Sequence, residues 1–252
     1  MHNQKTKKQY DKKSDLIVEF LALFNQIDKH FDKLLWIDNF IPFNEKIKRI
    51  SKGDYHISWF VKLNQYQIKH FGEIRNELTH GIKLDGYSYV YPSDYAMSQL
   101  KKYVNVIKKP FKCIDLFKRP VFTCTIDDNL KKILKIMDKN NYSHVPVYGE
   151  NKNYLWLLAE SEVLAWLTEG ESSKDMGLAK VGDIPLLSDL EYIIFVDKKC
   201  NVYEIDKLFA IKKQRRKKLG VILITENWDK NEKILGIITA GDTALIDAYV
   251  VR

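Results

Sequence analysis

Apolar residues in the first half of the chain recur at steps of three and four, which is the spacing of one face of a helix. From Ser14 to Ile37 this pattern predicts one long helix, and Ser14 or Asp15 can cap its start. Further helices are predicted over 43–50, over 55–80 and over 93–107. Gly81 stands where a C-terminal cap would end the second of these, and Pro110 closes the third.

No marked strand pattern precedes Pro110. Residues 14–111 are therefore expected to form an all-α bundle, and residues 1–13 a flexible basic tail. That tail carries five lysines, and one interpretation of it is a solubilising arm.

Beyond Pro110 the pattern changes to short runs rich in β-branched residues that alternate with helical stretches. In the first set, strands are predicted over 121–126, 144–148 and 154–158, and helices over 129–137 and 161–168. After a polar linker, the second set has strands over 192–196, 220–225 and 234–239, and helices over 201–209 and 242–250. The predicted fold class is multidomain α+β, with a helical bundle followed by a tandem βαββα unit.

The tandem can be checked residue by residue. Cys113-Ile-Asp-Leu corresponds to Val181-Gly-Asp-Ile, and Thr125-Ile-Asp-Asp corresponds to Phe195-Val-Asp-Lys. Trp156-Leu-Leu-Ala-Glu-Ser-Glu corresponds to Gly236-Ile-Ile-Thr-Ala-Gly-Asp. A unit of roughly 70 residues therefore occurs twice, over about 112–170 and about 181–251.

Composition excludes several classes of protein. A hydrophobic content of 45% is too high for a disordered chain. The longest apolar runs span about five residues, whereas a membrane helix needs about 20. Three widely spaced cysteines form neither a disulfide framework nor a CxxC metal site. Without a secretory signal pattern, the chain is expected to be cytoplasmic, with no membrane partner.

Positive charge is concentrated in the first half. Residues 1–111 hold 19 Lys and Arg against 12 Asp and Glu, whereas residues 112–252 hold 22 against 21. This asymmetry suggests that the first half meets a polyanion.

The repeat, the segment His144-Val-Pro-Val and the ending Gly236-Ile-Ile-Thr-Ala-Gly-Asp242 together resemble the CBS (cystathionine β-synthase) domain pair over residues 112–251. The resemblance implies an adenine nucleotide (AMP, ADP or ATP) bound as a regulatory ligand between the repeats. Thr239 would contact phosphate and Asp242 would accept hydrogen bonds from the ribose hydroxyls. The remaining positions implied are Ile237, Gly220, Val221, Phe122 and Lys218.

The first copy departs from this motif. It has Ala159 in place of the threonine, Glu162 in place of the aspartate and Trp156 in place of the glycine. One nucleotide per chain is therefore expected, at Thr239 and Asp242. The alternative is that these two residues only cap a helix.

A basic run, Lys212-Lys-Gln-Arg-Arg-Lys-Lys218, holds six cations in seven residues just before a predicted strand. Three interpretations stay open: a solvated loop, contact of Lys217 or Lys218 with nucleotide phosphates, and contact with an RNA backbone.

The segment Arg75-Asn76-Glu-Leu-Thr-His80 ends the second long helix, and in a small α-bundle it resembles the HEPN motif. The resemblance, over roughly residues 14–111, implies a metal-independent ribonuclease acting as a homodimer. Histidine can transfer protons near neutral pH, and a guanidinium can clamp a phosphate. Asn76 lies four residues before His80 and could orient the imidazole or the phosphate. Alternatively, Arg75 and His80 merely pair at a helix end, where cations are favoured.

The predicted function is therefore an RNA-cleaving, homodimeric HEPN ribonuclease regulated by its CBS pair, with no required cofactor and no metal. The alternative is a non-enzymatic nucleotide sensor whose helical bundle dimerises or recruits a partner.

Overall fold

The computed structural model describes residues 2–81, 83–84, 87–150, 153–168, 177–185, 193–214 and 220–250, apart from the side chains of residues 2–12, 83–84, 87 and 212–214. The chain divides into two compact units. The helical unit comprises Met1–Phe111, Asn201–Lys207 and Ala244–Arg252. The α/β unit comprises Lys112–Cys200 and Leu208–Thr243.

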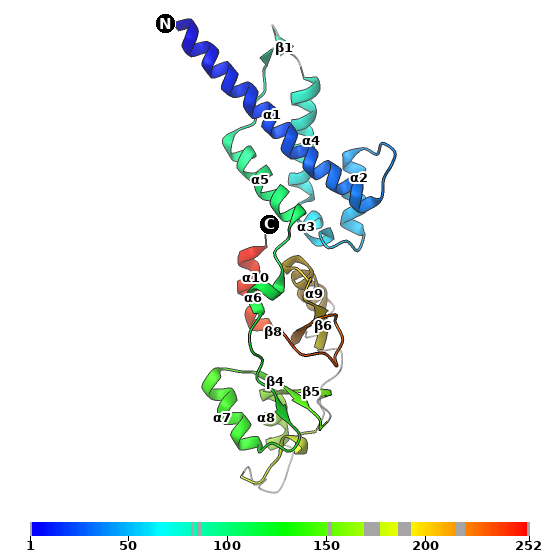
Figure 1. The fold of residues 1–252 in the computed structure, drawn as a ribbon, viewed down its shortest axis with the longest axis vertical. Helices are drawn as coiled ribbons and strands as arrows, with labels where there is room; N and C mark the ends of the chain where they lie inside the picture. Colours follow the sequence, from blue (N-terminus) through cyan, green and yellow to red (C-terminus); the bar gives the residue numbers. More distant parts are fainter. Residues whose placement is uncertain are drawn as a thin grey trace. The chain divides into compact units, whose positions relative to one another are not determined.

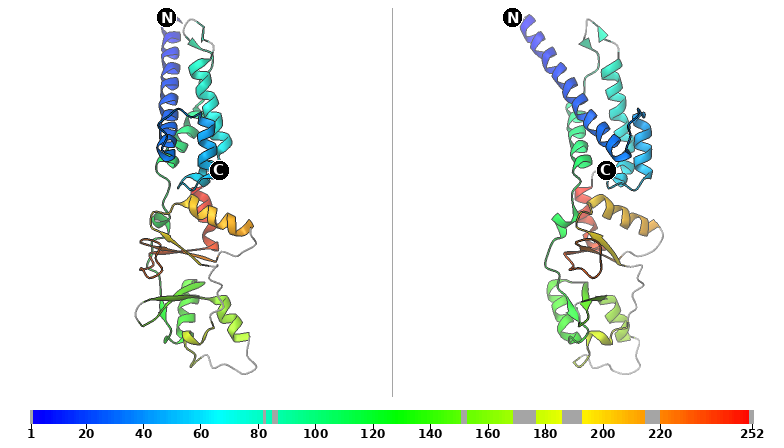
Figure 2. Two further views of the ribbon diagram at one scale, coloured as in Figure 1. Left: turned by 90° about the vertical axis from the view of Figure 1, so that its right-hand side faces the viewer. Right: turned by 45° about the vertical axis from the view of Figure 1, so that its right-hand side comes forward.

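The helical unit is built from five helices of the first half of the chain (Figure 1): α1 (His2–Leu35), α2 (Phe43–Lys52), α3 (Ser58–Leu63), α4 (Gln65–His80) and α5 (Asp94–Lys108). α1 packs along both α4 and α5 (Figure 2). Its fully buried side chains include Phe20 and Phe31, which lie on the apolar face that the sequence predicted. Ser93 caps the start of α5, where its hydroxyl accepts a hydrogen bond from the Ala96 amide at 3.1 Å.

Two features of this unit differ from the sequence prediction. α1 begins at His2, so the backbone of residues 2–13 is helical where we expected a flexible tail. Lysine and glutamine are good helix formers and extend the amphipathic helix that follows. In addition, β1 (Lys83–Leu84) and β2 (Tyr87–Ser88) form a short antiparallel hairpin after α4, where no strand was expected.

The second long helix of the prediction is two helices, divided at Asn64. This residue ends α3 and precedes α4 with φ −112° and ψ 17°, outside helical geometry. It is fully buried, its Nδ2 donates to the Phe60 carbonyl at 3.0 Å, and its Oδ1 accepts from the Tyr103 hydroxyl at 2.7 Å. An asparagine amide that bonds the backbone competes with the helix ladder, which explains the break.

Two tyrosines on the predicted apolar faces are exposed. Tyr66 follows the predicted apolar face but is 77% exposed, and Tyr95 on α5 is 74% exposed. Ile68, Phe71 and Leu78 are buried as expected. The helical period was therefore read correctly, whereas its phase at the start of α4 was not.

The α/β unit contains the same topology twice. The first sheet has the order β3 (Cys124–Thr125), β4 (His144–Tyr148), β5 (Tyr154–Ala159), and the second has the order β6 (Ile193–Asp197), β7 (Val221–Thr225), β8 (Gly236–Thr239). In each sheet the first pair of strands is parallel and the second pair antiparallel. The helices of the two copies are α7 (Leu130–Asn140), α8 (Glu160–Thr168), α9 (Val202–Gln214) and α10 (Thr243–Tyr249). The predicted tandem βαββα order is confirmed.

Two local assignments in this unit were wrong. The strand expected over 121–126 is reduced to the two residues of β3, and Cys113–Phe117 forms a short helix, α6, that was not predicted. The segment that follows α6 pairs instead with the second sheet, where Lys118 bridges to Gly236 and the Arg119 guanidinium donates to the Ile237 carbonyl at 3.2 Å. Tertiary pairing has replaced the local strand preference.

The leading segment of each repeat packs against the other repeat. The Cys113 amide bonds the Cys200 carbonyl at 2.9 Å, and the Leu130 amide bonds the Ala179 carbonyl at 2.9 Å. Residues 112–119 therefore pack with the second copy, and residues 179–181 pack with the first. The boundaries of the sequence repeats and of the folded repeats consequently do not coincide.

The helical unit is also not limited to residues 14–111. It includes the first turns of α9, where the Tyr203 ring packs edge-on against Phe60 with centroids 5.1 Å apart. The Trp59 indole donates to Asp206 Oδ2 at 2.7 Å, and the Asn201 amide donates to the His56 carbonyl at 2.9 Å. These contacts add Asn201–Lys207 to a unit whose first segment ends at Phe111.

Among the described residues, no helix combines the length and the apolar character needed to cross a lipid bilayer.

The buried bond between Tyr103 and Asn64 gives a first test of this fold. Burial raises the pKa of the Tyr103 hydroxyl to about 12. Tyr103→Phe leaves Asn64 Oδ1 without this donor, and we expect a loss of about 1–3 kcal/mol in the free energy of unfolding, measured by urea denaturation. Tyr95→Phe, on the exposed side of the same helix, should change it by less than about 0.5 kcal/mol. Equal effects of the two substitutions would contradict the role assigned to Asn64.

Candidate functional site

The candidate nucleotide residues of the second repeat lie where β8 ends. Thr239 is its last residue, and a short 3-10 turn, η3 (Ala240–Asp242), leads into α10. Asp242 Oδ2 accepts hydrogen bonds from the Thr239 amide at 2.8 Å and from the Thr239 hydroxyl at 2.9 Å. The carboxylate thus caps the turn, which is the capping role that the sequence left open. Both bonds use the same oxygen.

An apolar wall adjoins Thr239. Val221 is its register partner on β7 and is fully buried, and Gly220 just before it is also buried. Ile237 packs in one cluster with Val221 and with Leu157 of the first repeat. The structure therefore brings together Thr239, Asp242, Val221 and Ile237, as the resemblance implied, in a region where the two repeats pack against each other.

Phe122 is not part of this group. It packs against the core of the first repeat and stacks on Tyr142, with ring centroids 6.2 Å apart and planes 19° apart. Its neighbour Val121 is the residue that contacts the cluster of Ile237 and Val221. Phe122 therefore lies apart from Ile237 and Val221, because tertiary packing sets the side on which each residue of this segment lies. Lys217 and Lys218 lie outside the described residues.

In the first repeat, Ala159 and Glu162 correspond to Thr239 and Asp242 and form a similar cap, but Ala159 has no hydroxyl. The Ala159 amide donates to Glu162 Oε2 at 3.2 Å, and Glu162 is only 8% exposed.

Packing explains why the second repeat has a glycine, Gly236, where the first repeat has Trp156. A Cβ on Gly236 would lie 2.5 Å from the Phe117 carbonyl oxygen, so the approach of the α6 segment requires glycine there.

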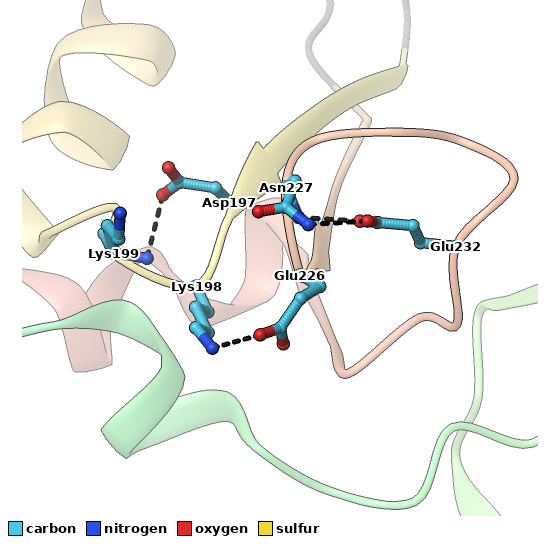
Figure 3. A network of polar contacts seen from close by, with 6 residues as sticks. All are labelled: Asp197, Lys198, Lys199, Glu226, Asn227 and Glu232. Carbon is cyan, nitrogen blue, oxygen red and sulfur yellow. Dashed lines mark hydrogen bonds and ion pairs between the residues drawn. The ribbon is translucent and has the colours of Figure 1, made fainter.

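A network of polar side chains closes the loop between β7 and β8 (Figure 3). The Asn227 amide nitrogen donates to Glu232 Oε1 at 2.8 Å, and Lys198 pairs with Glu226. The bonds from Asn227 lower the pKa of Glu232. The register places this loop beside Ile224 and Gly236, at the far end of the sheet from Thr239. The network therefore stabilises a loop and is separate from the candidate nucleotide residues.

The Arg-Asn-x-x-x-His motif lies on the last turns of α4. Arg75 Nη1 donates to Asn76 Oδ1 at 3.0 Å, and the Thr79 hydroxyl donates to the Arg75 carbonyl at 2.8 Å. Arg75 and Asn76 line a cavity of about 240 Å³ together with Lys69. His80 is the exposed last residue of the helix and is not among the lining residues. Five residues correspond to about 140° of rotation, so one helix cannot direct Arg75 and His80 to the same point.

Sequence reasoning missed the aromatic part of this cavity. Phe40, in the connection between α1 and α2, lines it and is 91% exposed, and Phe43 lines it from the start of α2. Residues in a connecting segment have no periodicity that would indicate the side on which they lie. Within the described part of the chain, no group of His, Cys, Asp and Glu side chains could hold a metal ion.

Comparison with known proteins gives one family match. Residues 113–166 match the family model of the CBS domain. No curated protein matches the chain.

Solved structures similar to this chain include the CBS domain pair of protein MJ0100, in complex with 5′-methylthioadenosine and S-adenosyl-L-methionine. It is 14% identical, with 55% of this chain and 97% of that chain covered and a TM-score of 0.41. A putative acetoin utilization protein from Vibrio cholerae is 19% identical over 55% of this chain and 91% of its own, with a TM-score of 0.42. The CBS domain protein TA0289 from Thermoplasma acidophilum is 15% identical over 57% of this chain and 71% of its own, with a TM-score of 0.41.

The family match covers the first repeat, and the second repeat has the same strand order and pairing. The chain therefore contains a CBS domain at residues 113–166, as its sequence predicted.

Proposed function

We propose that the α/β unit binds an adenine nucleotide at Thr239 and Asp242 and acts as a regulatory sensor for the helical unit. The observation that carries the proposal is the position of the Asp242 carboxylate, bonded to the Thr239 amide and hydroxyl beside Val221 and Ile237. The carboxylate can accept from ribose hydroxyls, and the Thr239 hydroxyl, which donates to Asp242 in this structure, would turn to donate to a phosphate when a ligand is bound. The neighbouring Val221 and Ile237 make the surroundings of the site apolar.

We propose one nucleotide per chain. At the matching position of the first repeat, Ala159 supplies an amide but no hydroxyl. Trp156 is the first-repeat residue that corresponds to Gly236 in the sequence, and its indole packs against the first-repeat core. A ligand there would lack the threonine donor that the second repeat offers.

A thermal shift assay tests this site. A ligand that binds only the folded protein adds about 2.7 kcal/mol of stability at about 100 times its Kd, which raises Tm by several degrees. We expect AMP, ADP or ATP to give such a rise in the wild-type protein and none in Asp242→Ala. Thr239→Val should reduce the rise, because it keeps the shape of the side chain but removes the hydroxyl, and Thr239→Ser should retain it.

Each shift is measured against the same variant without nucleotide, because loss of the Asp242 cap alone costs about 1 kcal/mol. Glu162→Ala in the first repeat is the matched control and should keep the full rise. Equal loss in Asp242→Ala and Glu162→Ala would show that the first repeat also takes part in binding, and would contradict its assignment as the degenerate site.

A second candidate function concerns the helical unit, for which we propose a metal-independent ribonuclease. The observation that favours it is the Arg75 guanidinium, held by Asn76 at a cavity that Lys69 also lines. These cations could hold a phosphate, and His80 could transfer the proton of a 2′-hydroxyl. Because Arg75 and His80 diverge on α4, we propose that a homodimer combines the Arg75 of one protomer with the His80 of its partner.

The ribonuclease proposal predicts cleavage of single-stranded RNA in excess EDTA, with 2′,3′-cyclic phosphate ends. A DNA strand of the same sequence should survive, because it lacks the attacking hydroxyl. We expect His80→Ala to lower the rate of RNA cleavage about 10²–10⁴-fold. Arg75→Lys should also lose cleavage activity, because an ammonium group cannot make the two-pronged contact of a guanidinium with phosphate. Gln65→Ala, an exposed change at the other end of α4, should cleave normally.

The outcome separates the enzyme from the binding module. Intact RNA with every adenine nucleotide, together with a lowered Tm of His80→Ala, would assign His80 to a structural cap. The helical unit would then dimerise or recruit a partner. A monomer by light scattering would also remove the composite site.

A further inference from the structure

A second and larger cavity lies on the other side of α4. It has a volume of about 420 Å³ and is enclosed by α4, α5 and the connecting residues 90–93. Gln67, His70 and Ile74 line it from α4, whereas Arg75 and Asn76 line the smaller cavity. At 100° per residue these two sets lie on roughly opposite sides of the helix. The cavity is therefore distinct from the candidate ribonuclease residues.

Aromatic rings form both the floor and the rim of this cavity. Phe71 and Tyr103 are 6% and 3% exposed, and their rings meet edge to face with centroids 5.3 Å apart. The Tyr103 hydroxyl is bonded to Asn64, so its ring is the part available to the cavity. Tyr66 and Tyr95, which also line the cavity, are 77% and 74% exposed. The cavity thus combines a fixed aromatic floor with two tyrosines that are open to solvent.

The polar groups around these rings fit a nucleobase. Gln67 and Gln99 line the cavity from α4 and α5, and an amide both donates and accepts, as the edge of a base does. Among the described lining residues none carries a carboxylate, and Lys13 Nζ lies 4.8 Å from the ring centroid of the lining residue Tyr91. With 19 Lys and Arg against 12 Asp and Glu in residues 1–111, the unit also attracts polyanions.

We propose that this tyrosine cavity binds an unpaired nucleobase of a single-stranded nucleic acid. The base stacks on the aromatic rings, the glutamine amides contact its edge, and Lys13 faces the adjoining phosphate. A volume of about 420 Å³ is within the range of small-molecule sites. The inference rests on the proposed contact of the helical unit with RNA, but it requires neither cleavage nor an occupied site at Thr239. A free nucleotide offers the same chemistry, and the experiment separates the two sources.

Fluorescence anisotropy with labelled oligo(dA) tests the cavity, because a DNA strand cannot be cleaved through a 2′-hydroxyl. We expect Tyr66→Ala and Tyr95→Ala each to weaken binding roughly 5- to 150-fold, the usual cost of losing one stacked base. Tyr66→Phe and Tyr95→Phe should bind like the wild type, because the ring is retained. The matched control is Tyr89→Ala, a tyrosine that is 65% exposed and does not line the cavity.

Competition identifies the source of the base. Unlabelled single strands should displace the probe, whereas a duplex should compete poorly because its bases are already stacked. Stronger competition by AMP than by unlabelled oligo(dA) at the same nucleotide concentration would assign the cavity to a free nucleotide and overturn the proposal. Displacement by a proline-rich peptide, absence of binding, or equal loss in Tyr89→Ala would overturn it as well.

The outcome of this test can be distinguished from the outcomes of the tests of the other proposals. Both tyrosines are exposed, so their alanine variants should melt within about 2 °C of the wild type. These variants should keep the nucleotide-dependent rise in Tm that Asp242→Ala loses. Failure of RNA cleavage with retained, tyrosine-dependent binding of oligo(dA) would refute the ribonuclease and leave this cavity standing.

Discussion

The buried hydrogen bond between the Tyr103 hydroxyl and the Asn64 side chain fixes the geometry on which the helical unit depends. It links α5 to the point where α3 ends and α4 begins, and a buried amide and phenol must satisfy each other at that point. Beyond this point α4 carries Arg75 and Asn76 on one side, and Gln67 and the aromatic floor on the other. The two candidate RNA contacts of this unit therefore share one helix.

The α/β unit depends on a different constraint, the reciprocal exchange of leading segments. Because α6 and the residues after it pair with the second sheet, Gly236 has to leave room for the Phe117 carbonyl. The motif glycine thus has a packing role independent of any ligand. Thr239 and Asp242, three and six residues further on, carry the polar groups of the proposed site. A sequence motif can therefore combine residues that serve the fold with residues that serve binding.

Two helices are shared between the units along the chain. α10 starts directly after Asp242, and its Tyr249 ring packs on Phe111 within the helical unit, with centroids 4.6 Å apart. α9 contributes Tyr203 and Asp206 to the same unit. A nucleotide would regulate the helical unit only if it bound one conformation of these helices more tightly than another, since coupling is a difference in binding free energy.

Hydrophobic periodicity and the internal repeat were enough to predict most helices of the first half and the tandem βαββα order, and the motif residues of the repeats added the resemblance to the CBS domain. These features are local or repeated, so the sequence by itself determines them. The division at Asn64, the exposure of Tyr66, the exchange of α6 and the position of Phe122 required the tertiary structure. Three of these depend on a partner elsewhere in the chain: Tyr103 for Asn64, the second sheet for α6 and Tyr142 for Phe122. A one-dimensional pattern cannot reveal which distant group will satisfy a buried polar atom or cover a ring, because that choice is made by packing in three dimensions.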